Sequence, residues 1–128
     1  MKRILTTIVI LINLNLNAQS KIGETFNADL TLTERGLTYL SFKNADYQYI
    51  NDYEVVGIYN SDSLYQFITD GMSKDLHAWS DYKIIGKDET LRINFDGKKV
   101  SFWVTQKHGV TSYSSRYKIK QINQLFGK

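Results

Sequence analysis

Two histidines, His77 and His108, are the side chains best suited to acid–base chemistry near neutral pH. Asp75 lies two residues before His77, and Asp81 lies four residues after it. On a strand, Asp75 and His77 would share one face and form a histidine–carboxylate pair, which is the beginning of a hydrolytic or metal site. No motif supplies a nucleophile or a third ligand, so we assign no catalytic residue and expect neither a metal nor a cofactor.

Several well-defined catalytic and cofactor motifs are absent from the sequence. The 128 residues contain no cysteine, which excludes disulfides, thiolate zinc sites and catalytic thiols. Two Ser-x-x-Lys matches, at 80–83 and 115–118, lack the Lys-Thr-Gly companion found in β-lactamase-type enzymes. The nucleophile elbow, the phosphate loop, the dinucleotide fingerprint and the calcium loop are also missing. These absences favour a binding protein over an enzyme.

Trp103 is the strongest candidate for a binding residue. Aromatic residues make up 13% of the chain, and most occupy predicted strands, where they suit a half-buried surface. Trp103 differs because strand alternation places it among hydrogen-bonding side chains, where an indole can stack on a sugar ring or anchor a protein contact. The candidate ligand-binding residues are Trp103, Arg92, Ser101, Thr105 and Thr90. The alternative is that a loop, such as the segment around Trp79, covers Trp103.

The element that must position these residues is a β-hairpin over residues 90–106. Asp96-Gly97 separates two alternating segments, and Asp-Gly in that place predicts a type I′ turn. The two-residue loop fixes the register, and the predicted pairs are Phe95–Lys98, Ile93–Val100 and Leu91–Phe102. The apolar side chains then share one face of the hairpin, and the polar side chains share the other face with Trp103.

The remaining pattern predicts an α+β fold. Period-two alternation indicates further strands over 26–33, 37–43, 47–59, 82–85 and 110–114. Helical spacing indicates one helix over 61–72 and a second that begins near residue 116. Each helix follows strands joined by short turns, and each has one apolar stripe. We expect an antiparallel sheet of about six or seven strands with two helices packed on one face; the alternative is a small β-barrel closed by the C-terminal helix.

The N-terminus has the features of an export signal. Lys2-Arg3 precedes an apolar stretch over residues 4–16, and Ala18-Gln19-Ser20 supplies small residues for cleavage. A membrane-spanning helix needs about 20 apolar residues, so the stretch is too short to span. We expect a secretory signal peptide over residues 1–20, cleaved after Ala18 or Ser20, and a single domain over 21–128. The protein is then secreted or periplasmic, without stable membrane insertion after cleavage; an uncleaved N-terminal anchor is the alternative.

The charge distribution bears on the partner. Residues 19–82 carry four basic and ten acidic side chains, a net −6, whereas residues 83–128 carry ten basic and three acidic, a net +7. The mature chain is therefore almost neutral, and an exported protein does not meet nucleic acid, so we expect no nucleic-acid partner. We expect instead a non-enzymatic binding domain that recognises a protein or glycan of the cell envelope. A small secreted hydrolase using a histidine–carboxylate pair, and an inhibitor-type partner protein, are the alternatives.

Overall fold

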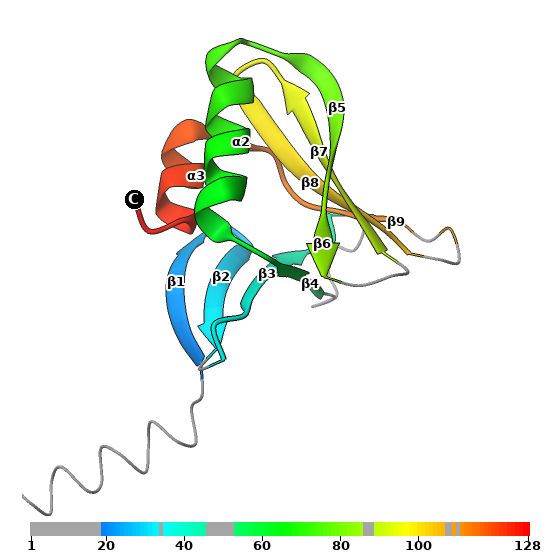
Figure 1. Cartoon of the computed structure of the whole chain (residues 1–128). Coiled ribbons are helices and arrows are strands. Elements are labelled where there is room, and N and C mark those ends of the chain that lie inside the picture. The colour runs from blue at the N-terminus through cyan, green and yellow to red at the C-terminus, as the bar shows by residue number, and fades with distance from the viewer. Residues whose placement is uncertain (1–18, 34, 46–52, 86–88, 107–108, 110) are drawn as a thin grey trace, which may run out of the picture.

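The computed structural model describes residues 19–33, 35–45, 53–85, 89–106, 109 and 111–128, which Figure 1 shows in colour. Most of the predicted signal peptide and His108 lie outside these residues. The described chain is an α+β fold made mostly of antiparallel strands, with two helices. The strands form two five-stranded sheets, so the single sheet expected from the sequence is wrong, and they do not close into the alternative barrel.

The two sheets divide the chain almost in half. The first sheet has the order β1 (Gln19–Thr25), β2 (Ala28–Thr33), β3 (Thr38–Lys43), β4 (Tyr53–Ile58) and β6 (Ile84–Ile85). The second sheet has the order β10 (Tyr117–Lys118), β8 (Lys99–Gln106), β7 (Glu89–Asp96) and β5 (His77–Tyr82), and β9 (Thr111–Tyr113) also pairs with β8. Lys83 alone separates β5 from β6, so one residue carries the chain from the second sheet to the first.

Both sheets turn an apolar face towards one common core. Leu40 on β3 and Ile93 on β7 belong to the same buried cluster, although their strands lie in different sheets. The rings of Phe42 on β3 and Phe102 on β8 stack with centroids 6.2 Å apart, which joins the two layers directly. Two short helices could not bury the apolar face of a single long sheet, and packing the two sheets together supplies the missing cover.

The two helices lie side by side but cover different sheets (Figure 1). α2 (Ser61–Ser73) packs on β7 and β8, whereas α3 (Ile119–Leu125) packs on β1 and β2. Asn60 caps α2, since its side-chain oxygen accepts a hydrogen bond of 3.1 Å from the backbone N–H of Ser63. The Tyr65 hydroxyl on α2 donates to Asn123 Oδ1 on α3 at 2.6 Å. The expectation that both helices share one sheet face is therefore wrong as well.

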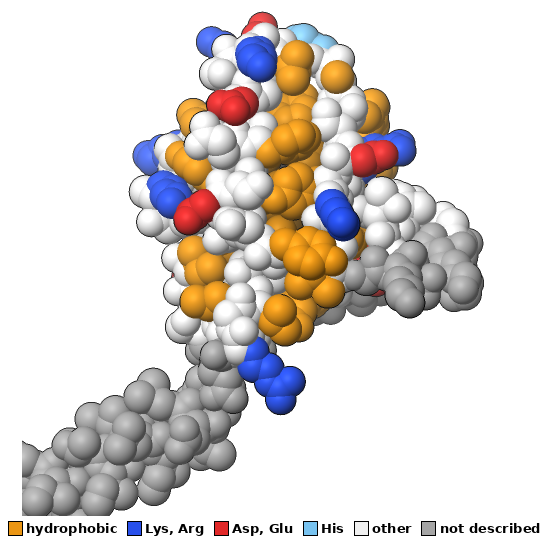
Figure 2. Space-filling model, in the orientation of Figure 1, with side chains coloured by type: hydrophobic (Ala, Val, Ile, Leu, Met, Phe, Trp, Pro, Cys, Tyr) orange, Lys and Arg blue, Asp and Glu red, His pale blue; other side chains and the backbone are white. Residues whose placement is uncertain are grey.

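An apolar band runs between α2 and β5 on the face shown in Figure 2. The rings of Phe67 on α2 and Tyr82 on β5 bridge these elements, with centroids 5.6 Å apart. Phe67 also contacts the buried ring of Phe95, at 5.9 Å between centroids. This band is thus the outer margin of the core, where α2 closes against the edge of the second sheet.

The β7–β8 hairpin forms where the sequence predicts it, but with another register. The turn residues are Gly97-Lys98, so Asp96 pairs with Lys99 and every predicted pairing is wrong by two residues. Gly97 has φ +63° and Lys98 has no positive φ, as expected for a type II′ turn, which needs positive φ only at its first central residue. Because the shift is even, each side chain still faces the side of the sheet that was predicted for it.

Tyr117 on β10 ties the second sheet to the first. Its ring is fully buried and lies 6.0 Å from the Phe102 ring, centroid to centroid. Its hydroxyl donates a 2.7 Å hydrogen bond to the carbonyl oxygen of Phe26, between β1 and β2. Burial raises the pKa of the Tyr117 hydroxyl, because the ionised form would lose its hydration, so Tyr117 stays a neutral donor.

α2 approaches the second sheet closely at Gly71, where the Phe95 ring leaves no room for a Cβ atom. A Cβ added to Gly71 would lie 2.3 Å from Cε1 of the Phe95 ring. Glycine to alanine stabilises an exposed helix by about 1 kcal/mol. Here we predict that Gly71→Ala lowers the free energy of unfolding by about 1–3 kcal/mol, because overpacking forces the helix or the ring to shift. Urea denaturation followed by circular dichroism measures the difference.

The double variant Gly71→Ala/Phe95→Leu is the control, since leucine removes ring atoms that the alanine would meet. The two substitutions together should destabilise the protein less than the sum of their separate effects. A Gly71→Ala protein more stable than the parent would contradict the close approach of α2 to β7.

Candidate functional site

The outer face of the second sheet, which points away from the core, brings the five predicted binding residues together. Arg92 pairs with Trp103 across the β7–β8 hairpin, and Thr90 pairs with Thr105. Ser101 lies two residues before Trp103 on β8, so strand alternation puts it on the same face. Thr90, Arg92 and Thr105 are exposed, Trp103 is half-buried, and Ser101 is buried.

Trp103 stands inside an aromatic cluster that we define as Trp79, Trp103 and Tyr113. Its ring stacks on Tyr113 of the neighbouring strand β9, with centroids 4.4 Å apart and an interplanar angle of 16°. Trp79 meets it edge-on, at 5.0 Å and 76°. The indole Nε1–H of Trp103 donates to Ser101 Oγ at 2.9 Å. Trp103 is thus held in place on three sides, and Trp79, from strand β5, is one of the residues that cover it.

Trp79 gives the cluster its accessible surface, since this residue is 50% exposed. Arg92 lies over the Trp79 ring, with its guanidinium carbon 5.9 Å from the centroid. The same guanidinium also pairs with Asp81, because Arg92 Nε donates to Asp81 Oδ1 at 2.9 Å. A cation over an indole face is attractive in its own right, so Arg92 steadies Trp79.

Trp79 and Tyr113 are functional candidates that the sequence did not single out. Tyr113 lies in one of the predicted strands, but the sequence does not show which strand is its neighbour. The structure pairs this strand with β8, and the pairing places Tyr113 opposite Trp103. The segment that holds Trp79 showed no clear alternation. It becomes strand β5 by pairing along its whole length with β7.

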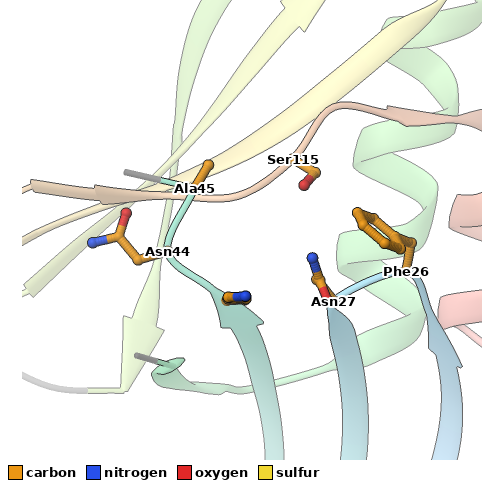
Figure 3. Close-up of a pocket in the computed structure, with 6 residues that line it drawn as sticks. Phe26, Asn27, Asn44, Ala45 and Ser115 are labelled. Atoms are coloured by element: carbon orange, nitrogen blue, oxygen red, sulfur yellow. The ribbon is translucent and has the colours of Figure 1, made fainter. Parts of the chain in front are cut away.

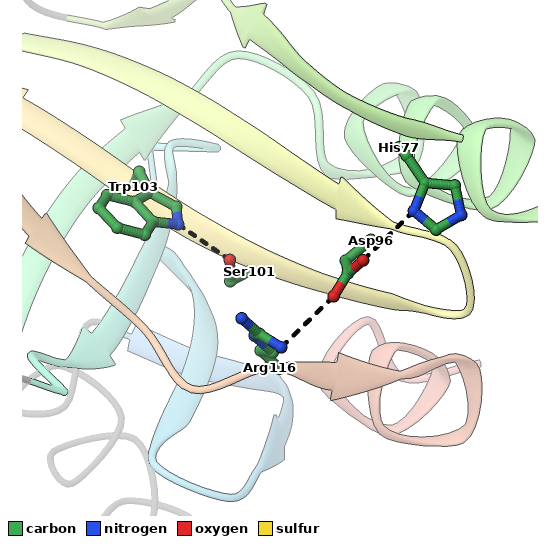
Figure 4. Close-up of polar contacts among 5 residues, drawn as sticks. All are labelled: His77, Asp96, Ser101, Trp103 and Arg116. Atoms are coloured by element: carbon green, nitrogen blue, oxygen red, sulfur yellow. Dashed lines mark hydrogen bonds and ion pairs between the residues drawn. The ribbon is translucent and has the colours of Figure 1, made fainter. Parts of the chain in front are cut away.

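A polar group lies at the turn end of the same face (Figure 4). Asp96 stands between two partners: its Oδ1 lies 3.3 Å from His77 Nδ1, and its Oδ2 accepts a 3.3 Å hydrogen bond from Arg116. His77 comes from β5, Asp96 ends β7, and Arg116 precedes β10. The carboxylate partner of His77 is therefore Asp96, and not Asp75 or Asp81, its neighbours in the sequence.

The His77–Asp96 pair is the contact that a hydrolase would need, but its surroundings are open. The side chain of His77 is 65% exposed and that of Asp96 is 49% exposed. Within the described residues, no serine or threonine hydroxyl bonds to His77. A general base also works best where water is excluded and a nucleophile is held within reach. This arrangement is better suited to hydrogen bonding a ligand than to activating a nucleophile.

The described ranges of the chain show neither a metal-binding cluster nor a membrane-spanning helix. There, no group of three or more histidine, aspartate or glutamate side chains is placed to hold a metal ion. Neither helix in this part of the chain has the length and apolar character needed to cross a membrane.

A hollow of about 340 Å³ lies where the two sheets meet (Figure 3). Phe26 and Asn27 line it from the β1–β2 turn, Asn44 and Ala45 follow β3, and Ser115 lies opposite. Its polar groups are used to join the sheets: the Ala45 N–H donates to the Tyr113 carbonyl at 2.7 Å, and Asn44 Oδ1 accepts from the Tyr113 N–H at 3.4 Å. We therefore interpret this hollow as a structural joint and not as a ligand site.

Comparison with known proteins finds no match to this chain among family models, curated proteins or solved structures.

Substitution of the two tryptophans should affect stability unequally. We predict that Trp103→Ala lowers the free energy of unfolding by about 2 kcal/mol, because it removes two ring contacts and a hydrogen bond that together hold three strands. Trp79→Ala should cost about 1 kcal/mol or less, because half of its surface already faces water. Urea denaturation of both variants measures this difference, and equal losses would contradict the placement of Trp103 between Trp79 and Tyr113.

Proposed function

We propose that the protein is an exported, non-enzymatic binding module that recognises a component of the cell envelope with the outer face of its second sheet. The observation that carries this proposal is the half-exposed Trp79, fixed by Trp103 on one side and by Arg92 on another. An aromatic side chain that is already held in place loses little entropy on binding, so it suits a recognition surface. The partner is a protein or a glycan of the envelope.

The residues around the aromatic cluster suit such a contact. Thr90, Thr105 and Asn94 provide neutral hydrogen-bonding groups on the same face, and Arg92 provides a charge. An aromatic centre with a polar rim is the usual arrangement of a recognition surface. Both helices pack elsewhere, on β1, β2 and the core-facing side of the second sheet, so neither of them covers this face.

Export rests on the N-terminal residues, which have the charged start, the apolar run and the small residues of a signal peptide. The position of β1 bears on the cleavage site. Gln19 and Ser20 pair with Thr33 and Leu32 as the first residues of β1. Cleavage after Ala18 would leave this strand whole, whereas cleavage after Ser20 would remove its first two residues. We therefore propose Ala18 as the last residue of the signal and a secreted or periplasmic location.

The second candidate is a small secreted hydrolase, which the His77–Asp96 contact favours. In that case the imidazole would act as a general base on water, with Asp96 orienting the ring. The exposure of both side chains and the lack of an enclosed pocket around them make this candidate the weaker of the two. An inhibitor-type partner protein would use the same outer face as the binding module, and its target would be a protein.

Retention of envelope material by the immobilised protein tests the proposal. We predict that Trp79→Ala and Arg92→Ala each reduce the amount retained from a solubilised envelope fraction by about tenfold or more, since centrally placed tryptophan and arginine contribute most to such contacts. The retained material is measured by mass spectrometry for protein and by sugar analysis for glycan.

Phe26→Ala is the matched control, because Phe26 is a 63% exposed aromatic residue in the β1–β2 turn, away from the outer face of the second sheet. This variant should retain as much material as the parent protein. Equal retention by Trp79→Ala, Arg92→Ala and Phe26→Ala would contradict the outer face as the recognition surface. Release of cleaved envelope polymer by the parent protein, but not by His77→Gln, would favour the hydrolase.

A further inference from the structure

We propose that the hollow beside Trp79 binds one pyranose ring of an anionic glycan, an inference that rests on the binding function proposed above. The hollow has a volume of about 350 Å³, near the lower limit for small-molecule sites. We call it the Trp79 pocket. Its lining comes from β5, from β7 and from the segment before β10, and it includes His77, Trp79, Asn94, Asp96 and Arg116.

The Trp79 pocket combines the two surfaces that a sugar ring presents. One face of a pyranose carries C–H groups and packs on an aromatic ring, and Trp79 supplies that ring with half of its surface accessible. The rim of a pyranose carries neighbouring hydroxyl groups, each of which both donates and accepts. Asn94 and Asp96 supply an amide and a carboxylate that can bond two such hydroxyls at once.

The polar side of the pocket is held in place before any ligand binds. Asp96 is braced by His77 and by Arg116, each at 3.3 Å (Figure 4). Trp79 is braced by Trp103 at 5.0 Å between ring centroids, and by the guanidinium of Arg92 at 5.9 Å from its ring. Side chains that are already fixed lose little conformational entropy on binding, which suits a weakly hydrophobic ligand such as a sugar.

Charge around the pocket favours a glycan that carries carboxylate or phosphate groups. Lys99 lies opposite Asp96 in the β7–β8 pairing, and Lys118 lies next to Lys99 on β10. With Arg116, these residues place three exposed cations at this end of the sheet, against the carboxylates of Asp96 and of Asp75, which lies beside Gly97 and His77. An anionic group beside the stacked ring would meet this basic edge.

The competing occupant is an acidic protein surface, which would use the same tryptophan and the same cations. The neutral amide of Asn94 and the carboxylate of Asp96 distinguish the two. The side-chain carboxylates of an acidic peptide have no hydrogen to donate to Asp96, whereas the hydroxyls of a sugar ring can donate to this carboxylate and also bond the Asn94 amide. The observations therefore favour the sugar.

Isothermal titration calorimetry with defined polymers tests the inference on the intact, purified protein, because the heat of binding does not depend on Trp79 as a reporter. The probes are polygalacturonate, the glycan strands of peptidoglycan, uncharged dextran, and polyglutamate as an anion without sugar rings. We expect polygalacturonate or peptidoglycan strands to bind, and dextran to bind more weakly. Any binding of polyglutamate should be the same for the parent protein and for Trp79→Ala. Trp79→Ala and Asp96→Ala should each weaken sugar binding by about tenfold or more, and Phe26→Ala should leave it unchanged.

The outcomes separate this inference from the proposed function. If no sugar polymer binds, or if binding survives in both Trp79→Ala and Asp96→Ala, the sugar subsite is wrong. If the immobilised protein then still retains an envelope protein that Trp79→Ala loses, the binding function stands without the sugar. If Trp79→Ala reduces neither the binding of a sugar polymer nor the retention of an envelope protein, both proposals are wrong.

Discussion

The β7–β8 pairing is the constraint on which the whole outer face depends. Leu91, Ile93 and Phe95 on β7 are almost fully buried, so the alternation of the strand obliges Arg92 and Asn94 to face the other way. A slip of one residue would expose three large apolar side chains and bury an arginine, at a cost that no contact on the outer face could offset. The burial of one face therefore determines the chemistry of the other.

The outer face is also where neighbouring strands are held together by side chains. Trp103 stacks on Tyr113 across β8 and β9, while Trp79 reaches it from β5 over the intervening strand β7. The same contacts that stabilise the sheet leave half of Trp79 accessible beside the Asp96 carboxylate. In the binding function proposed here, the contacts that stabilise the sheet would also hold Trp79 ready for a partner.

The sequence predicted what depends on local alternation and missed what depends on the partner of each strand. The α+β class, the hairpin and the facing of Trp103 followed from period-two spacing, and the even register error left that facing intact. The division into two sheets was missed, because alternation shows which residues are buried but not against which layer. Trp79 and Asp96 were missed as site residues for the same reason: only the β5–β7 pairing brings His77 to Asp96 and Trp79 next to Asn94.

The accessibility of the two tryptophans tests the central claim most directly. Trp103→Phe leaves Trp79 as the only indole, and Trp79→Phe leaves Trp103, since the chain contains two tryptophans. Acrylamide quenching should be strong for Trp79, with emission at long wavelength, and clearly weaker for Trp103, with emission at shorter wavelength. Strong protection of both indoles would show that another part of the protein covers the outer face, and that result would contradict the account.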